Sequence, residues 1–259
     1  MDVMIVCQSG TGNTRLGAEA MGAEFEAAGH NCTIVSVRDA QPDRLAAAHV
    51  IGVAAPVHGF RPARNVLRFV NSLPELRGKQ GFVLCCCSAV AANSVRTLWQ
   101  ALGAKGVRVL GGHTLIGEDS WPFLRLGPLT PGRGCPSPDG LERVREFARG
   151  IVARAAELDS PAPRAPAWWP SPFHFIGLLA TQRTLRWMML GKRVDASRCT
   201  RCGKCVEVCP TGAIEMQDVP KFTSACTGCF ACINNCPERA INCPMSWGRS
   251  LYRGPQSAD

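Results

Sequence analysis

The chain has 259 residues, of which 46% are hydrophobic and 19% charged, which excludes a disordered chain and allows one large domain or two modest ones. Its formal net charge is +9, and its 15 cysteines far exceed the usual content of a cytosolic protein. Met1 to Ser9 contain no basic region followed by a long apolar stretch, so we expect no signal peptide and a reducing, cytoplasmic location. In that compartment, metal ligation by thiolates is favoured over a disulfide framework.

Through residue 158, short apolar runs alternate with segments of helical periodicity. We expect strands over Val3–Val6, Cys32–Val37, His49–Ala54, Gly81–Cys87 and Val107–Leu110. We expect helices over Arg15–Ala28, Ala63–Leu73, Asn93–Leu102 and Leu141–Leu158, with Glu118–Pro138 as a loop insertion before the last helix. This alternation implies a parallel sheet covered on both faces, and five strands is the size of a flavodoxin-like doubly wound domain. The predicted fold class is therefore α/β.

A loop rich in glycine and hydroxyl side chains follows the first predicted strand. It consists of Ser9, Gly10, Thr11, Gly12, Asn13 and Thr14. The loop opens into a predicted helix, whose N-terminal amides and dipole favour an anion. A dinucleotide fingerprint would need a third glycine at position 15, which is Arg15, so the loop suits a phosphate monoester. This stretch resembles the phosphate loop of flavodoxins, and the resemblance implies FMN as cofactor.

The same resemblance implies that the loops after the third and fourth strands hold the isoalloxazine ring. The expected contacts are Pro56, Val57, His58, Gly59 and Phe60 in one loop and Ser88, Ala89 and Asn93 in the other. Both loops follow the carboxyl ends of strands, where ligands bind in open α/β sheets. The second loop departs from the family because Ser88–Asn93 contain no aromatic residue, so His58 or Phe60 is the only ring expected against the flavin. A loop position without flavin contact is the alternative for His58.

The connector between the two halves of the chain is proline-rich and basic. Residues 159–172 hold five prolines and predict a semi-rigid linker. The apolar segment Phe173–Leu190 is about long enough to span a bilayer, but Arg183 and Arg186 near its middle make spanning costly. We therefore predict an amphipathic helix that packs between the domains and no transmembrane segment. Contact with a membrane surface or a partner is the alternative, because residues 160–198 hold six bases and one acid.

Two cysteine runs with identical spacing form the strongest signal in the sequence. The first contains Cys199, Cys202, Cys205 and Cys209, and the second contains Cys226, Cys229, Cys232 and Cys236. A proline follows each run, at Pro210 and Pro237. Both runs have the spacing of bacterial two-cluster ferredoxins. Zinc sites are the alternative, but they usually pair their ligands across a longer loop.

Residues 195–245 resemble the ferredoxin domain that holds two 4Fe–4S clusters. In that domain the fourth cysteine of each run ligates the cluster of the other run. The resemblance implies one cluster on Cys199, Cys202, Cys205 and Cys236, and a second on Cys226, Cys229, Cys232 and Cys209. Cys243 lies outside the pattern, and we expect a packed thiol there.

The whole chain resembles bacterial and archaeal flavodoxin–ferredoxin fusion proteins over residues 1–155 and 195–245. We expect a flavodoxin-like FMN domain at 1–158, a linker and helix at 159–194, a small α+β two-cluster ferredoxin domain at 195–245 and a tail at 246–259. The bound groups would lower the net charge to about +3. With no helix-turn-helix or RNA-binding signature, the charge does not predict nucleic-acid binding.

The predicted function is electron transfer between FMN and two 4Fe–4S clusters, to or from a redox partner protein, which we expect to be acidic. A flavin-dependent reductase of a small molecule, fed with electrons by the clusters, is the alternative, so the sequence leaves open whether the protein is an enzyme. A homodimer is a further alternative, because a second copy would bring the two kinds of centre together if the distance within one chain were too long.

Overall fold

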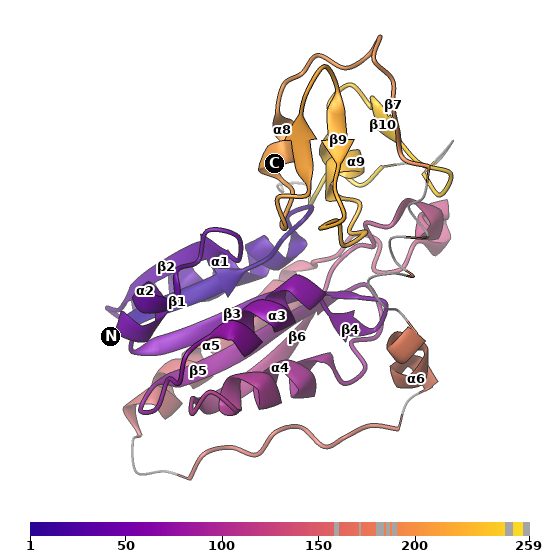
Figure 1. The fold of residues 1–259 in the computed structure, drawn as a ribbon. Coiled ribbons are helices and arrows are strands. Elements are labelled where there is room, and N and C mark those ends of the chain that lie inside the picture. The colour runs from indigo at the N-terminus through magenta and orange to yellow at the C-terminus, as the bar shows by residue number, and fades with distance from the viewer. Residues whose placement is uncertain are drawn as a thin grey trace.

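The computed structural model of the chain describes residues 1–157, 161–170, 172–179, 184, 187, 191–246 and 251–255. Its first part is built on a sheet of five parallel strands in the order β2-β1-β3-β5-β6. The strands are β1 (Asp2–Cys7), β2 (Asn31–Ser36), β3 (Val50–His58), β5 (Gln80–Cys87) and β6 (Arg108–Ile116). With the short hairpin strand β4 (Arg61–Pro62) set aside, this is the flavodoxin-like doubly wound order. The predicted fold class is thus confirmed (Figure 1).

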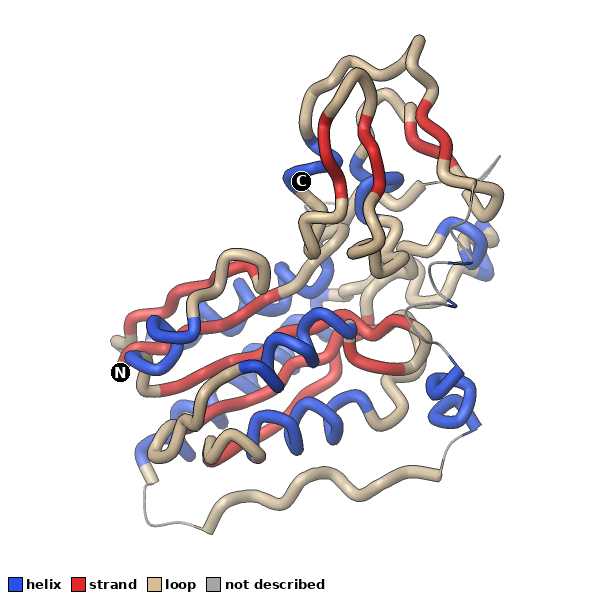
Figure 2. Tube along the Cα trace, in the orientation of Figure 1, coloured by secondary structure: helices blue, strands red, loops and turns tan. Residues whose placement is uncertain are grey.

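Helices cover both faces of the sheet, as the sequence pattern predicts. The helices α1 (Asn13–Ala27) and α5 (Pro138–Ala156) pack on one face through one apolar cluster. The other face carries α2 (Pro42–Ala47), α3 (Arg64–Ser72) and α4 (Ser94–Gly103) on a second cluster (Figure 2). The helix α2 and the strand β4 have too few residues for a periodic signal, so sequence analysis missed both.

Two predicted strands are longer in the structure. The strand β3 continues to His58 and pairs through Val57 and His58 with β4, while β6 continues to Ile116. Part of the segment assigned to a loop after residue 118 forms two short 3-10 helices, Pro122–Leu124 and Gly127–Leu129. The extensions matter because they carry two loops to the same edge of the sheet.

Gly52 in β3 lies in register with Phe82 in β5, and a Cβ there would collide with the Phe82 ring. We expect Gly52→Ala to lower the free energy of unfolding by about 1–3 kcal/mol, because the buried ring has no room to move. Gly22→Ala is the matched control, since its Cβ would meet only ordinary contacts at 3.5 Å inside α1. Urea unfolding of both variants checks the prediction, and an equal loss in the two would contradict it.

The second part of the chain contains two short antiparallel pairs and two short helices. The strand β7 (Arg193–Val194) pairs with β10 (Ile241–Asn242), and β8 (Ile214–Met216) pairs with β9 (Pro220–Phe222). Each cysteine run leads into one helix, α8 (Lys204–Glu207) or α9 (Ala231–Asn235). The left-handed backbone recurs at matching positions of the runs, namely Arg201 and Gly228, Gly203 and Phe230, and Gly212 and Arg239. The identical spacing of the two cysteine runs is therefore matched by a repeated backbone conformation.

The two parts contact each other through polar side chains of α9 and of the C-terminal segment. Asn235 Nδ2 donates to Gly10 O at 2.8 Å, and Asn234 Nδ2 donates to Ser120 O at 2.7 Å. The hydroxyl of Tyr252 donates to Asn13 Oδ1 at 2.5 Å. The loops that carry the two cysteine runs thus lie directly on the loop Ser9–Thr14 of the first part, the phosphate-type loop. This contact is at the carboxyl ends of the parallel strands (Figure 1).

In the chain segment that connects the two parts, the structure describes α6 (Pro172–Leu179), a portion of the predicted helix Phe173–Leu190. Residues 180–183, 185–186 and 188–190 of that prediction lie outside the described residues. The Phe173 ring lies 4.8 Å from that of Phe60, and Gly177 approaches the backbone of Gly59. These contacts are with the β3–β4 hairpin of the first part rather than with both domains. No helix among the described residues is both long and apolar enough to cross a membrane.

Candidate functional site

The eight cysteines of the two runs line two separate cavities. One cavity of about 310 Å³ is lined by Cys209, Cys226, Cys229 and Cys232, and another of about 320 Å³ by Cys199, Cys202, Cys205 and Cys236. The two groups equal the two ligand sets expected from the sequence, including the exchange of the fourth cysteine. Among the described residues, no three His, Cys, Asp or Glu side chains are placed to hold a single metal ion. Sets of four thiols around a wider cavity have the donor chemistry of a 4Fe–4S cluster.

Hydrogen bonds to sulfur repeat in the two cavities. Ala213 N donates to Cys209 Sγ and Ala240 N donates to Cys236 Sγ, both at 3.2 Å. The cavity of Cys226 has an additional cation, because Lys192 Nζ lies 3.0 Å from Cys226 Sγ. Such donors stabilise negative charge on sulfur and raise the reduction potential of a cluster.

We expect Lys192→Met to lower the reduction potential of the cluster expected on Cys226, because one positive charge and one sulfur hydrogen bond are lost. The potential of the other cluster should change little. Redox titration followed by electron paramagnetic resonance measures both. Lys221→Met in β9 is the control, since Lys221 is exposed in the same domain. Equal shifts in the two variants would contradict the specific role of Lys192.

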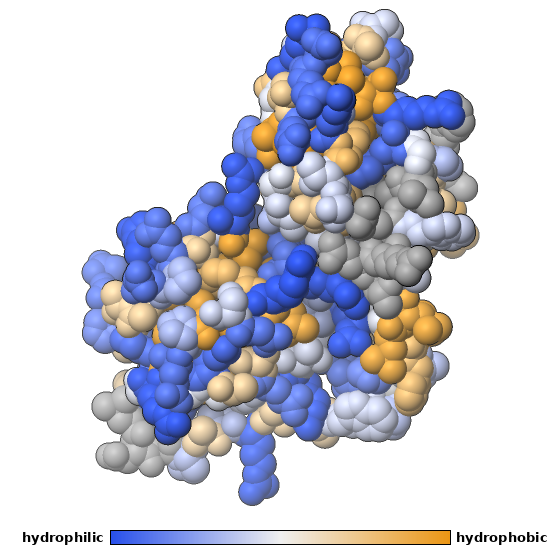
Figure 3. Space-filling view, viewed as in Figure 1, coloured by the Kyte–Doolittle hydropathy of each residue, from blue (hydrophilic) through white to orange (hydrophobic). Residues whose placement is uncertain are grey.

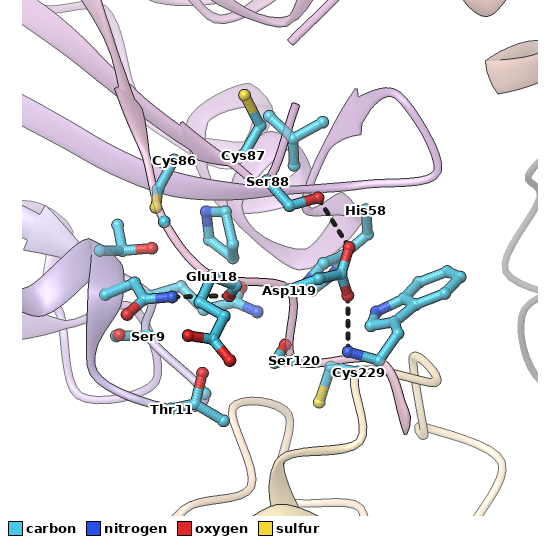
Figure 4. A pocket seen from close by; sticks show the side chains of 18 residues that line it. Ser9, Thr11, His58, Cys86, Cys87, Ser88, Glu118, Asp119, Ser120 and Cys229 are labelled. Atoms are coloured by element: carbon cyan, nitrogen blue, oxygen red, sulfur yellow. Dashed lines mark hydrogen bonds between the residues drawn. The ribbon is translucent and has the colours of Figure 1, made fainter. Parts of the chain in front are cut away.

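A third cavity lies at the carboxyl ends of β1, β3, β5 and β6 and encloses about 540 Å³, part of it open to solvent. The predicted residues that line it are Ser9, Gly10, Thr11, Asn13, Thr14, Pro56, Val57, His58 and Ser88. Figure 4 shows Ser9 and Thr11 on one side of the cavity, with His58 and Ser88 on the other. The structure therefore brings the phosphate-type loop and both predicted ring loops to one place.

Five predicted residues do not line this cavity: Gly12, Gly59, Phe60, Ala89 and Asn93. Gly12 has φ +102, and its place at the start of α1 needs that conformation. Asn93 instead holds the linker, since its side-chain amide exchanges two hydrogen bonds with the backbone of Trp169. The Asn13 side chain donates to Glu118 O at 2.9 Å and accepts from Tyr252, so it joins three segments.

Sequence analysis missed the loop after β6, residues 117–121, which supplies the far wall of the cavity. Asp119 accepts from Ser88 Oγ at 2.6 Å and from Trp121 N at 2.7 Å, as the dashed lines in Figure 4 mark. The Trp121 ring lies 6.3 Å from the His58 ring. The expectation that His58 or Phe60 would be the only ring against the flavin did not include this aromatic, which comes from a third loop. Its only sequence signal was one tryptophan in a Gly- and Pro-rich stretch.

The polar wall of this cavity contains an amide without a partner. Gln8 is 2% exposed and lines the cavity, and neither its Nε2 nor its Oε1 has a hydrogen-bond partner among the described residues. A buried amide in that condition costs about 1–3 kcal/mol, which a ligand with donors and acceptors would offset. Together with three hydroxyl side chains on a loop before a helix, it fits a phosphorylated polar cofactor such as FMN.

Cys229 lines both this cavity and the cavity of Cys209, Cys226 and Cys232. The next residue, Phe230, takes a left-handed backbone with φ +58 and is 1% exposed. Its ring lies 5.8 Å from the ring of Trp121. A bulky residue there costs about 1–3 kcal/mol of strain, which its aromatic contacts offset. The two cavities thus share Cys229, and a tilted pair of rings joins them, because Trp121 lines one cavity and Phe230 the other.

Desolvation lowers the pKa of His58 from 6.5 to about 4, so its imidazole is neutral at pH 7. Because the folded pKa is depressed, His58 stabilises the fold fully above pH 6.5, and this stability is lost as the pH falls from 6.5 towards 4. We expect His58→Gln to reduce the loss of unfolding free energy in that window. Denaturant unfolding at several pH values measures the difference between the two proteins. An identical pH dependence in both would contradict the assignment.

Comparisons with known proteins give matches to each of the two parts of the chain. Residues 192–215 match the family of 4Fe-4S binding domains, a range that contains the first cysteine run only. No curated protein matches the chain. The strand order and the family match together describe a flavodoxin-like sheet followed by a 4Fe–4S binding domain.

Several solved structures are similar to the first part of the chain. A flavodoxin from the domain Archaea is 18% identical, covers 60% of this chain and 99% of its own, and has a TM-score of 0.47. The two-electron reduced flavodoxin from Megasphaera elsdenii is 23% identical over 57% of this chain and 99% of its own, with a TM-score of 0.44. The rubredoxin oxygen:oxidoreductase from Desulfovibrio gigas is 15% identical over 61% of this chain and 37% of its own, with a TM-score of 0.47.

Proposed function

We propose that this protein is an electron carrier that binds one FMN at residues 1–158 and two 4Fe–4S clusters at residues 195–245. The observation that carries the proposal is the position of Cys229. This residue lines both the third cavity, at the carboxyl ends of the parallel strands (the FMN-type cavity), and one four-cysteine cavity. When bound, FMN exchanges one or two electrons and each cluster exchanges one. A shared wall favours transfer between the two kinds of centre inside a single chain.

The residues of the FMN-type cavity divide into two roles. Ser9, Thr11 and Thr14 would hold the phosphate with the first turn of α1, and Gln8 would satisfy a polar group of the cofactor. His58 and Trp121 would hold the ring system from two loops, with the imidazole neutral. Asp119 fixes the second of these loops through Ser88 and Trp121 N.

The proposed order of the centres follows from which cavities share walls. Cys229 joins the FMN-type cavity to the cluster of Cys209, Cys226 and Cys232, while none of the other four cysteines lines the FMN-type cavity. Cys202, which belongs to the set that does not line the FMN-type cavity, is exposed, so electrons would leave or enter there. The exposed bases Arg198 and Arg201 near Cys202 suit an acidic redox partner. In this arrangement one chain is sufficient, and no homodimer is needed.

Flash reduction of FMN in the anaerobic holoprotein tests the proposal directly. Cluster bleaching after the flash should be first order and independent of protein concentration, since both centres lie in one chain. A rate proportional to concentration would favour transfer between chains and would overturn the proposed order. Iron, sulfide and FMN analysis should first give about eight iron and one FMN per chain.

Reduction of a small molecule at the flavin is the second candidate function. The observation that favours it is Asp119, a buried carboxyl that lines the FMN-type cavity and whose pKa is raised chiefly by burial. Turnover of an added small acceptor by the purified holoprotein with a chemical reductant would support this function. Transfer only to an added protein would support the carrier.

A further inference from the structure

The helix α6 has one inward face and one outward face, and the outward face is apolar. Phe173 and Gly177, four residues apart, contact the hairpin at Phe60 and Gly59. Exposed side chains fill the opposite side: Phe175 55%, Ile176 51%, Leu178 48% and Leu179 72%. A helix in water normally turns polar residues outward. This surface therefore lacks a partner within the described part of the chain.

Two tryptophans extend the apolar surface along the linker. Trp168 is 49% exposed and its ring lies 5.8 Å from the ring of His174 at the start of α6. Trp169 is 52% exposed, although two hydrogen bonds to Asn93 hold its backbone in place. Figure 3 shows a hydrophobic area over α6, with hydrophilic surface beside it. Tryptophan is the residue type enriched where protein meets the membrane–water interface.

One arginine lies against α6, and two more follow it along the chain. The side chain of Arg61 lies under α6, where its Cγ would be 3.1 Å from a Cβ at Gly177. Arg64 and Arg68 follow on one side of α3. Desolvation and then the charges of Arg61 and Arg68 lower the pKa of Arg64, so the three groups form one cluster of positive charge. No ion pair within the described ranges joins any of the three to an acid.

We propose that α6, with Trp168 and Trp169, binds the surface of an anionic lipid bilayer. The apolar face would enter the boundary between headgroups and acyl chains, and the arginine cluster would bind lipid phosphates. The proposed binding is peripheral, because the exposed apolar side chains lie on one side of the described helix only. The charge complementarity favours an anionic bilayer over an apolar protein groove. Docking there would bring the hairpin that carries His58 close to the membrane surface.

Co-sedimentation of the holoprotein with vesicles tests this proposal without reference to electron transfer. The wild type should bind vesicles that contain phosphatidylglycerol, bind pure phosphatidylcholine weakly, and lose affinity as salt rises. The double variant Ile176→Asp/Leu179→Asp should bind at least about tenfold more weakly, because two apolar side chains no longer enter the bilayer. Leu129→Asp is the matched control, since Leu129 is 80% exposed outside this surface and should keep wild-type affinity.

The charge component is tested separately. Arg68→Gln should weaken binding to phosphatidylglycerol vesicles about fivefold and leave binding to phosphatidylcholine unchanged. Arg44→Gln on α2 is its control, because Arg44 is exposed away from α6. Two results would overturn the proposal: no vesicle binding by the wild type, which leaves α6 for a protein partner, or equal binding by the α6 double variant and the Leu129 control.

Discussion

Cys229→Ser is expected to abolish electron transfer from FMN to the clusters within the chain. Cys229 is the one cysteine of the two runs that lines the FMN-type cavity, and it is also one of the four thiols of the adjacent cysteine cavity. The iron content should fall from about eight to about four per chain, because one cluster loses a ligand. Flash reduction of the flavin should then cause no rapid cluster bleaching.

Cys202→Ser is the matched control for this variant. Cys202 belongs to the other cysteine set and is exposed. It should also lose about four iron per chain, but the flavin should still pass electrons to the remaining cluster. Transfer to an external partner should fall, because the exposed centre is missing. If Cys229→Ser kept fast flavin-to-cluster transfer, or if Cys202→Ser abolished it, the proposed order of centres would be wrong.

Asn234→Ala should weaken the contact between the two parts of the protein while leaving each part folded. Asn234 is 0% exposed, and its side chain donates to Ser120 O and accepts from Tyr252 N at 3.1 Å. The alanine variant leaves the part-buried Ser120 O and the buried Tyr252 N without this partner, which should lower the free energy of unfolding by about 3 kcal/mol. Because Ser120 lines the FMN-type cavity, FMN affinity should also fall.

Denaturant unfolding and FMN titration measure the two effects, and iron content reports whether the clusters remain. Asn242→Ala is the control in the same module, since its side chain makes a local bond to Arg239 O at 3.2 Å. We expect the control to keep wild-type FMN affinity. A loss of iron without any loss of FMN affinity would show that Asn234 serves its own module only.

The C-terminal segment 251–255 adds to the same junction. Arg253 Nη1 donates to Asn234 O and to Cys236 O, at 3.0 and 2.9 Å. On its other side, Arg125 lies over the Tyr252 ring at 5.2 Å and pairs with Glu118 at 2.7 Å, with both side chains largely buried. The loop after β6 and the cysteine loops therefore depend on one another for their position. These contacts fix the distance between the FMN-type cavity and the adjacent cysteine cavity. The linker between the two parts is therefore not needed to set that distance.

The sequence by itself determined the features whose signals are local. Alternation of apolar runs and helical segments predicted the parallel sheet, because each element buries its own periodic face. The cysteine spacing predicted which four thiols gather in each cavity, although the role of these thiols as cluster ligands stays a prediction. The loop Ser9–Thr14 was predicted from its glycines and its place before a helix.

Only the tertiary structure decided how these features meet. The aromatic of the FMN-type cavity is Trp121, and no periodicity links it to His58, 63 positions earlier in the sequence. The hydrogen bond from Tyr252 to Asn13 joins residues 239 positions apart in sequence, and that from Asn234 to Ser120 joins residues 114 positions apart. Asn93, predicted to contact the flavin, anchors Trp169 instead. Such contacts depend on how the helices, the sheet and the second part pack together, and the sequence around one side chain does not identify a partner far away in the chain. For this reason only the tertiary structure shows that Cys229 lines both cavities.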